Sequence, residues 1–350
     1  MRRWRLLAVA GLLITALMAV WGVRSVRPEV AASRAGHSVT PGPVESAGAG
    51  ADPTPAPTPP TSVAPSVAPT TTGQPAAPPS PARSSPSLLW GLWEPHWQTG
   101  GSTDFTTYTN VENQLAHRAD IVHWYANWDE SWSYDGGLVK KVVQSDRTPM
   151  ITWEAWNRPL PAIVAGQFDS YIDTWARGMA AYAPHPIYLR IFHEFNDPRA
   201  GESGYPWGVG GGTSNQPANL VAAWRHIHDR FVAAGATSVR FVWCPDGVNL
   251  DLNRLRAAYP GDAYVDFAGW DAYGYDTAAA YQTLSQVAPK PFVLAEMAGD
   301  PSWVRDLTGK LRSGGYGRIR ALVWFDEGKW RLDANPAVRS VVKDLLAGVS

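Results

Sequence analysis

The feature that most constrains this chain is a repeated alternation of short apolar runs and longer amphipathic stretches between residues 88 and 350. Eight runs of five or six residues have the composition of buried strands. The stretches between them place apolar residues three and four positions apart, as amphipathic helices do; examples are Phe168–Tyr182, Leu220–Ala234 and Trp303–Ser313. The eight expected strands are Leu89–Trp93, Asp120–Tyr125, Pro149–Trp153, Ile187–Phe192, Val239–Cys244, Val265–Trp270, Phe292–Glu296 and Ala321–Phe325.

Strands that alternate with helices predict an α/β fold with a parallel sheet. Eight such units within residues 88–350 match a closed (β/α)8 TIM barrel, whose usual size is about 250 residues. The alternative is an open doubly wound sheet. No glycine-rich nucleotide loop follows the first expected strand, so the barrel is preferred.

The first 87 residues differ in composition from the expected barrel. Basic residues in Met1–Arg5 precede an uncharged apolar run from Leu6 to Val23, as in an export signal. We expect a signal peptide or an uncleaved signal anchor over residues 1–30, and in the second case membrane anchoring. Residues 31–87 are rich in Pro, Ala, Thr and Ser and predict a disordered, extended linker without a core. The protein is therefore expected to be extracellular, either secreted or anchored.

Charge and cysteine content narrow the range of functions. The formal net charge is -1, with 30 basic and 31 acidic residues, so a neutral partner is expected and not nucleic acid. Cys244 is the only cysteine, which excludes an intrachain disulfide and a CxxC redox centre. We interpret it as a buried strand residue, and we expect a monomer.

The carboxyl ends of the expected strands are rich in aromatic and polar residues, and barrels of this class form their active sites at that end. Of 18 tryptophans, all but Trp4 and Trp21 lie in residues 88–350, most of them at these strand ends. Indole rings stack on the C–H faces of sugars, and carboxylates and amides bind hydroxyl groups. The pattern predicts a neutral polysaccharide as the partner.

Two glutamates, Glu194 and Glu296, follow apolar strands directly. Cleavage of a glycosidic bond needs two carboxyl groups, which makes this pair the best catalytic candidate. Either glutamate alone could be structural and paired with an arginine such as Arg190. Because position 190 shares a strand face with position 194 in a period of two, we expect Arg190 to point inward and tune a carboxylate.

Several segments resemble glycoside hydrolase family 26, which consists mainly of endo-β-1,4-mannanases. The resemblance extends over essentially all of residues 88–350. Asp197 and Met297 depart from the residues common in the family. The segments that carry the resemblance are Arg190–Asn196, Tyr205–Gly208, Trp224–Phe231, Trp270–Tyr275, Lys290–Glu296 and Trp324–Phe325.

The resemblance implies that the glutamate after the fourth strand is the acid/base and that the one after the seventh is the nucleophile, which are Glu194 and Glu296. It also implies that His193 and Trp207 border the central subsites, that Tyr273 contacts the nucleophile, and that catalysis uses no metal or organic cofactor. The other residues expected to bind substrate are Trp93, Trp128, Trp153, Glu154, Arg190, Asn196, Trp270, Asp271 and Trp324.

We therefore expect residues 88–350 to be the catalytic domain of a retaining endo-β-glycosidase that hydrolyses β-1,4-mannan by double displacement. Mixed-linkage β-1,3-1,4-glucan and β-1,3-xylan are alternative substrates on the same scaffold. A transglycosylase would use the same residues. A non-catalytic carbohydrate-binding wall protein would keep the aromatic residues without needing both glutamates.

Overall fold

The computed structural model describes residues 88–99, 105–197, 204–210 and 214–348, and within them eight parallel strands form one closed barrel. The predicted (β/α)8 fold is confirmed. β1 and β8 close the barrel by pairing along their lengths, from Leu89 with Ala321 to Trp93 with Phe325. The strands are β1 (Leu89–Trp93), β2 (Ile121–Asn127), β3 (Thr148–Glu154), β4 (Ile187–Ile191), β5 (Val239–Trp243), β6 (Phe267–Ala272), β7 (Phe292–Met297) and β8 (Ile319–Phe325).

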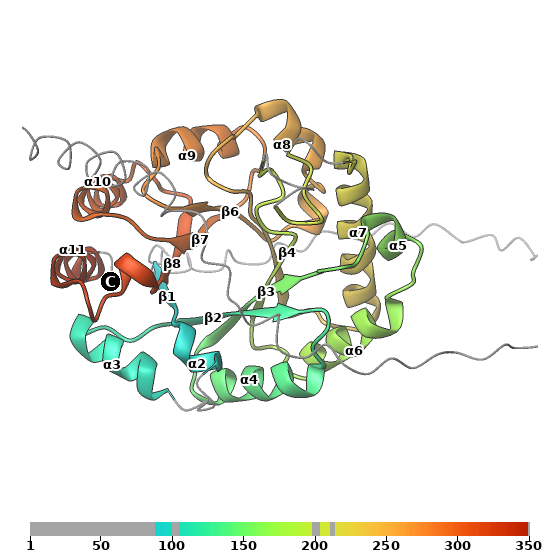
Figure 1. Cartoon of the computed structure of the whole chain (residues 1–350), viewed down its shortest axis with the longest axis horizontal. Coiled ribbons are helices and arrows are strands. Elements are labelled where there is room, and N and C mark those ends of the chain that lie inside the picture. The colour runs from blue at the N-terminus through green and yellow to red at the C-terminus, as the bar shows by residue number, and fades with distance from the viewer. Residues whose placement is uncertain (1–87, 100–104, 198–203, 211–213, 349–350) are drawn as a thin grey trace, which may run out of the picture. The chain divides into compact units, whose positions relative to one another are not determined.

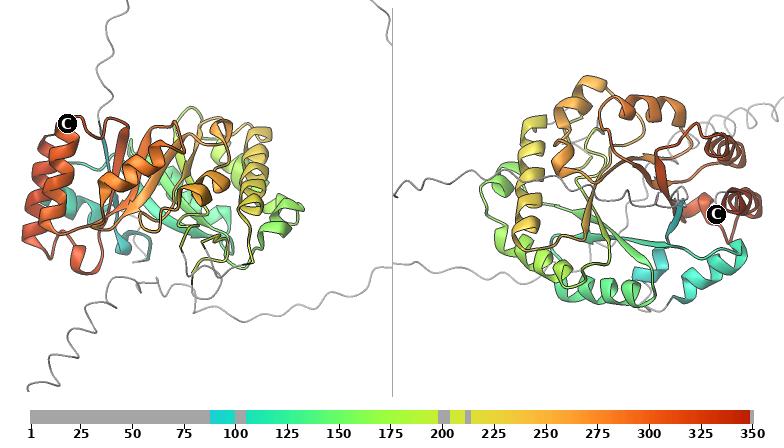
Figure 2. Two further views of the ribbon diagram at one scale, coloured as in Figure 1. Left: turned by 90° about the horizontal axis from the view of Figure 1, so that it is seen from above. Right: turned by 180° about the vertical axis from the view of Figure 1, so that it is seen from behind.

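Helices surround the barrel on its outer side, and the colour sequence in Figure 1 follows the chain once around it. The view from behind in Figure 2 shows the same ring. The helices are α2 (Pro95–Thr99), α3 (Thr106–Leu115), α4 (Trp132–Gln144), α5 (Leu160–Val164), α6 (Asp169–Ala180), α7 (Pro217–Ala233), α8 (Leu252–Ala258), α9 (Thr277–Ser285), α10 (Pro301–Arg312) and α11 (Pro336–Ala347), with 3-10 turns η2 (Asp262–Tyr264) and η3 (Gly328–Trp330).

The core has two layers, because a barrel strand is buried on both faces. A small cluster that includes Tyr188, Val242 and Val323 fills the barrel interior. A larger cluster, with Leu189 and Ile191 among its members, packs between strands and helices. Along β4 the side chains therefore alternate between the two layers with a period of two.

Strand limits differ from the predicted ones mainly at β2, β6 and β8, and β2 ends at Asn127, two residues after its predicted end. β6 begins at Phe267 and not at Val265, because the Asp266 side chain accepts a hydrogen bond from Phe241 N at 2.8 Å and stays in the preceding loop. β8 begins at Ile319, two residues before its predicted start.

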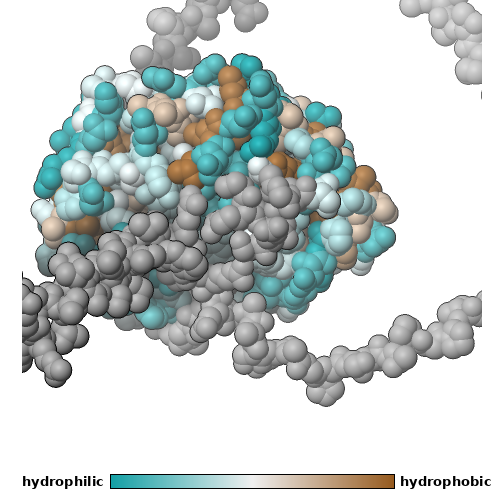
Figure 3. Space-filling model, turned by 45° about the horizontal axis from the view of Figure 1, so that its top comes forward, coloured by the Kyte–Doolittle hydropathy of each residue, from teal (hydrophilic) through white to brown (hydrophobic). Residues whose placement is uncertain are grey.

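The outer surface is mostly polar. On the face shown in Figure 3, hydrophobic residues lie in separate patches among hydrophilic ones. Among the described residues, the exposed large hydrophobic side chains are Tyr134, Val164 and Val232, and no helix is long and apolar enough to cross a membrane. The predicted signal or anchor (1–30) and the predicted linker (31–87) lie outside the described residues.

Candidate active site

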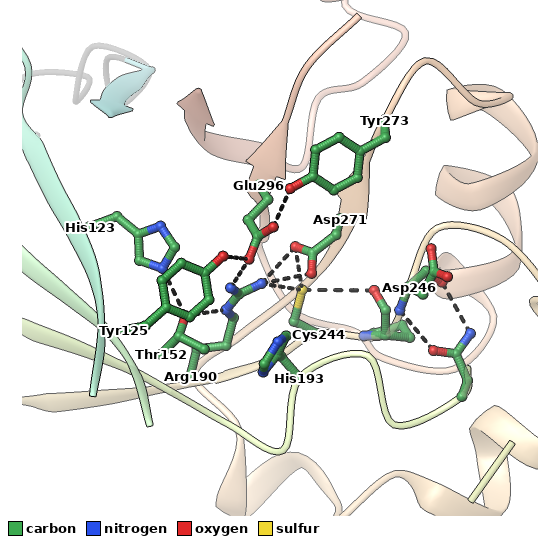
Figure 4. A network of polar contacts seen from close by, with 12 residues as sticks. His123, Tyr125, Thr152, Arg190, His193, Cys244, Asp246, Asp271, Tyr273 and Glu296 are labelled. Atoms are coloured by element: carbon green, nitrogen blue, oxygen red, sulfur yellow. Dashed lines mark hydrogen bonds and ion pairs between the residues drawn. The ribbon is translucent and has the colours of Figure 1, made fainter. Parts of the chain in front are cut away.

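Arg190 lies at the centre of a buried polar network at the carboxyl end of the barrel (Figure 4). Its Nη1 donates to both carboxylate oxygens of Asp271, at 2.7 and 2.8 Å, and its Nη2 donates to Glu296 Oε1. Its Nε donates to Thr152 Oγ1 at 2.8 Å. The prediction that Arg190 points inward and contacts a carboxylate is confirmed.

One guanidinium therefore faces two carboxylates. Burial acts to lower the pKa of Arg190, but the charges of Asp271 and Glu296 outweigh it and raise that pKa well above its usual range. Burial raises the pKa of Asp271, an effect that Arg190 opposes. Because a buried ion pair is costly to break, Arg190 is fixed in this position.

Two tyrosines complete the surroundings of Glu296. Tyr125 donates to Oε1 and Tyr273 donates to Oε2, so both carboxylate oxygens accept hydrogen bonds. Burial, together with the charge of Glu296, raises the pKa of both phenols well above the usual range, so both keep their protons. The predicted contact between Tyr273 and Glu296 is present.

A β-bulge turns Glu296 into the barrel. Trp270 pairs with Leu294, but the next residue, Asp271, pairs with Glu296, so Ala295 is the extra residue on β7. Without the bulge, Glu296 would share the outward face of Leu294. The bulge therefore brings Glu296 to the same side as Asp271.

Glu194 is placed by a tight turn and not by a strand. β4 ends at Ile191, and Phe192 and Glu194 both have φ of 50°, a left-handed conformation that is uncommon for residues other than glycine. The period of two expected between positions 190 and 194 is therefore wrong. Glu194 N donates to Cys244 O at 2.9 Å, which ties the turn to the end of β5.

Glu194 is half-buried, and its environment favours the protonated carboxyl. Burial and then the charge of Asp271 raise the pKa of Glu194 well above its usual range, although Arg190 opposes them. Asp246 and Glu296 act in the same direction as Asp271. The two glutamates thus differ in surroundings, since Glu296 accepts three hydrogen bonds and Glu194 lies among carboxylates.

A group of aromatic rings lies next to Glu194. His193 is 4.4 Å from Tyr205 and 5.6 Å from Trp207 between ring centroids, and the Tyr205 and Trp207 rings are stacked at 4.8 Å. Trp156 packs against both, and Trp207 Nε1 donates to His193 O at 2.8 Å. Burial and Arg190 lower the pKa of His193, so it is neutral at physiological pH.

A second aromatic group lies on the Glu296 side. Trp93 stacks on Phe325 with ring centroids 4.1 Å apart, and its ring is edge-on to Tyr125. Phe325 also meets the edge of Tyr273. Tyr125 and Tyr273 both donate to Glu296, so this aromatic group lies directly beside the Glu296 carboxylate.

Five other predicted substrate-binding residues are almost fully buried and are not brought to this site. Trp153 packs among Trp128, Tyr171 and Trp175, and the Trp324 indole donates to Trp330 O at 3.1 Å. Asn196 bonds the backbone of the loop after β5. The five residues are Trp128, Trp153, Asn196, Trp270 and Trp324.

Glu154, at the end of β3, stays within electrostatic range of the network. Burial raises its pKa to about 7, and the charge of Glu296 adds to this, whereas Trp156 and Arg190 lower it. Glu154 is half-buried and lies at the carboxyl end of its strand, as predicted.

Sequence reasoning missed Tyr125, Thr152, His123 and the contacts of Cys244. Thr152 Oγ1 accepts from Arg190, so its single proton goes to His123 Nε2, 2.7 Å away. Burial lowers the pKa of His123, which keeps that ring neutral. The sequence signal for His123, Tyr125 and Thr152 was the period of two along β2 and β3, which places their side chains inside the barrel.

No group of three or more His, Cys, Asp or Glu residues within the described ranges is suited to hold a metal ion. Catalysis without a cofactor stays a prediction.

The sequence model of glycosyl hydrolase family 26 matches residues 111–312. This chain belongs to that family. The family 26 chain is also 32% identical over 292 residues to Endoglucanase H of Acetivibrio thermocellus, an alignment that covers 75% of this chain and 31% of that protein. It thus spans about a third of the length of this curated relative.

Solved structures of the family share the fold. A ruminal GH26 endo-β-1,4-mannanase matches with a TM-score of 0.57 at 13% identity, over 74% of this chain and 63% of that one. The catalytic domain of a GH26 endo-β-1,4-mannanase from Bacillus sp. JAMB-750 matches with a TM-score of 0.55 at 14% identity, over 75% and 86%. At these identities the likeness is one of fold.

Proposed function

We propose that this family 26 chain is a retaining endo-β-glycosidase in which Glu194 is the acid/base and Glu296 the nucleophile. A Glu296 oxygen attacks the anomeric carbon while Glu194 gives its proton to the glycosidic oxygen, which leaves as a hydroxyl. Water then attacks the glycosyl ester, and Glu194 takes the proton of that water. Two inversions leave the anomeric configuration unchanged.

The observation that carries this proposal is the difference between the two glutamates. Glu296 accepts hydrogen bonds from Arg190, Tyr125 and Tyr273, so its carboxylate is held in one orientation. Burial raises the pKa of Glu194, which favours a proton ready for transfer. Opposite environments for two carboxyl groups are the usual basis of acid and nucleophile roles in glycosidases.

The aromatic groups on the two sides of the carboxyl pair support internal cleavage of a chain. Trp93 and Phe325 lie on the Glu296 side, and the half-buried Trp156 and Tyr205 lie on the Glu194 side. Aromatic rings on both sides can bind sugars before and after the scissile bond. An exo-acting enzyme needs such binding on one side only.

For the substrate we propose a neutral β-linked glucan as the first candidate. The relative that is 32% identical is named an endoglucanase, whereas the solved mannanases are 13 to 14% identical. Most of Endoglucanase H lies outside the match, so its name describes more than the matched part. β-1,4-Mannan was expected from the resemblance because most members of the family are mannanases. It is the second candidate, since two solved proteins with this fold are named endo-β-1,4-mannanases.

The test measures new reducing ends released by the full chain from mixed-linkage β-glucan, β-1,4-mannan and β-1,3-xylan. We expect the highest kcat/KM on β-glucan, and a loss of about 10³-fold or more in both Glu296→Ala and the isosteric Glu296→Gln. Proton NMR of the first product should show the β anomer. An α anomer would rule out retention.

Two alternatives give different results in the same assay. A carbohydrate-binding protein without catalysis would bind a polymer and release no ends from any of them. A transglycosylase would make products longer than the oligosaccharide supplied. We further propose that the enzyme is a monomer and that it acts outside the cell, secreted or held by its N-terminal segment. Fractionation of the native cells would test its location.

A further inference from the structure

Cys244 contacts the backbone of one proposed catalytic glutamate, Glu194, and two of the side chains around the other, Glu296. It follows β5 directly, is fully buried in the barrel interior, and is part of the polar network (Figure 4). Its carbonyl oxygen accepts the hydrogen bond from Glu194 N at 2.9 Å. Its side chain reaches in the other direction, toward Arg190 and Asp271.

The thiol is both donor and acceptor in these contacts. Cys244 Sγ lies 3.3 Å from Asp271 Oδ1 and 3.8 Å from Pro245 O. A thiol has one proton, and the nearer, charged oxygen is the stronger acceptor, so the proton goes to Asp271. Arg190 Nη1 donates to the sulfur at 3.7 Å. Burial and then Asp271 raise the pKa of Cys244 well above its usual range, so the group stays a thiol.

These contacts connect Cys244 to Glu296 through two residues. Asp271 Oδ1 accepts hydrogen bonds from both Arg190 Nη1 and the thiol. The thiol therefore restrains the orientation of the Asp271 carboxylate together with the guanidinium. Arg190 in turn donates to Glu296 from its other nitrogen. A small rotation of Asp271 would therefore move the guanidinium that orients the nucleophile.

We propose that Cys244 is a positioning residue that couples the two glutamates: its carbonyl oxygen fixes the turn that carries Glu194, and its thiol fixes the Asp271–Arg190 pair that binds Glu296. The proposal rests on the catalytic roles proposed above. It assigns the thiol no covalent step.

Three substitutions in the full chain separate positioning from packing. Cys244→Ser keeps a donor and an acceptor, Cys244→Val fills the space with a slightly larger side chain that has neither, and Cys244→Ala removes both volume and hydrogen bonds. The matched control is Val242→Ala, because Val242 lies two residues earlier on β5, is fully buried and belongs to the same interior cluster.

We expect kcat to fall about tenfold in Cys244→Ala and Cys244→Val with KM nearly unchanged, because the loss concerns the orientation of reacting groups. Cys244→Ser should stay within about threefold of the parent enzyme. Val242→Ala should unfold at a lower temperature but keep its kcat. Cys244→Ala combined with Asp271→Asn should cost less than the product of the two single effects, since both disturb one contact.

Equal losses of kcat in Cys244→Ser and Cys244→Val, or a loss in Cys244→Ala no larger than that in Val242→Ala, would overturn the positioning role. Failure of the proposed function looks different, because the parent enzyme would then release no reducing ends, or Glu296→Gln would keep its activity.

Discussion

At the scale of single residues, the proton on Glu194 decides the first chemical step. Its raised pKa means that it keeps its proton to a higher pH than an ordinary glutamate does and loses it as the pH rises further. We expect kcat/KM of the parent enzyme to fall as the pH rises through that pKa, and Glu194→Ala to lack this alkaline fall. A pH profile from about pH 4 to pH 10 on an unactivated aryl glycoside, whose leaving group needs that proton, measures both.

Leaving-group chemistry supplies the control for that prediction. A dinitrophenolate leaves without a proton, so Glu194→Ala should cleave a dinitrophenyl glycoside far better than a polysaccharide. If both substrates lose the same factor, Glu194 is not the acid. Glu296→Ala should lose both activities alike, since every substrate needs the nucleophile.

Asp135 in α4 permits a stability prediction at the same scale. Its side chain is fully buried, and its Oδ1 accepts from Trp124 Nε1 at 3.0 Å. Burial raises its pKa from 3.8 to about 7, so the folded state binds the proton more tightly than the unfolded state. This contribution to stability is fully present below about pH 4 and is lost as the pH rises to about 7, by up to about 4 kcal/mol.

Asp135→Asn resembles the protonated acid and has no such titration. Urea unfolding at about pH 5 and pH 8 should therefore show a smaller loss of stability in the variant than in the parent protein. Other buried carboxyl groups titrate in both proteins and cancel in the comparison. An equal loss in both would show that Asp135 is ionised at pH 5.

At the scale of elements, all eight strands could be predicted from the sequence, because each is an apolar run between helical stretches. The phase of the side chains was predicted correctly for Arg190 on β4, but it could not be predicted on β7 and β8. On β8, Trp324 faces the helices, whereas the next residue, Phe325, stacks on Trp93. Which of two neighbouring aromatic residues faces the site therefore depends on strand register. The β7 bulge reverses the face of Glu296, and an apolar sequence such as Phe292–Ala295 gives no sign of it.

The pairing of β6 with β7 leads to a prediction about Gly269. A Cβ at this position would lie 2.0 Å from Val293 O, which belongs to the backbone and cannot give way without moving the strand. We expect Gly269→Ala to lower the free energy of unfolding by about 1–3 kcal/mol. It should also lower kcat, because these two strands carry Asp271 and Glu296. Urea unfolding and initial rates measure the two effects.

Gly309 in α10 is the matched control for this substitution. A Cβ there meets nothing within 4 Å, and the residue is exposed. Gly309→Ala should therefore raise the free energy of unfolding by up to about 1 kcal/mol, because alanine favours the helix. If Gly269→Ala and Gly309→Ala changed the free energy of unfolding in the same direction, the close approach of β6 and β7 would not be what requires glycine at position 269.

At the scale of the whole molecule, closure of the barrel determines where the folded domain begins. β1 pairs with β2 on one side and with β8 on the other, so it is needed for closure. Trp90 and Leu92 on β1 are at most 2% exposed, and each such side chain contributes about 1.5–3 kcal/mol when buried. The composition of residues 31–87, by contrast, predicts no contribution to a core.

Two truncations test this boundary. A chain that lacks residues 1–87 should unfold in one cooperative transition at the temperature of the full chain and keep its kcat. A chain that lacks residues 1–94 also loses β1, which leaves the edges of β2 and β8 unpaired, and it should show neither near-UV circular dichroism nor activity. A lower unfolding temperature in the first variant would place the domain boundary within the proline-rich segment. Activity in the second variant would show that seven strands suffice to hold Arg190, Asp271 and Glu296 together.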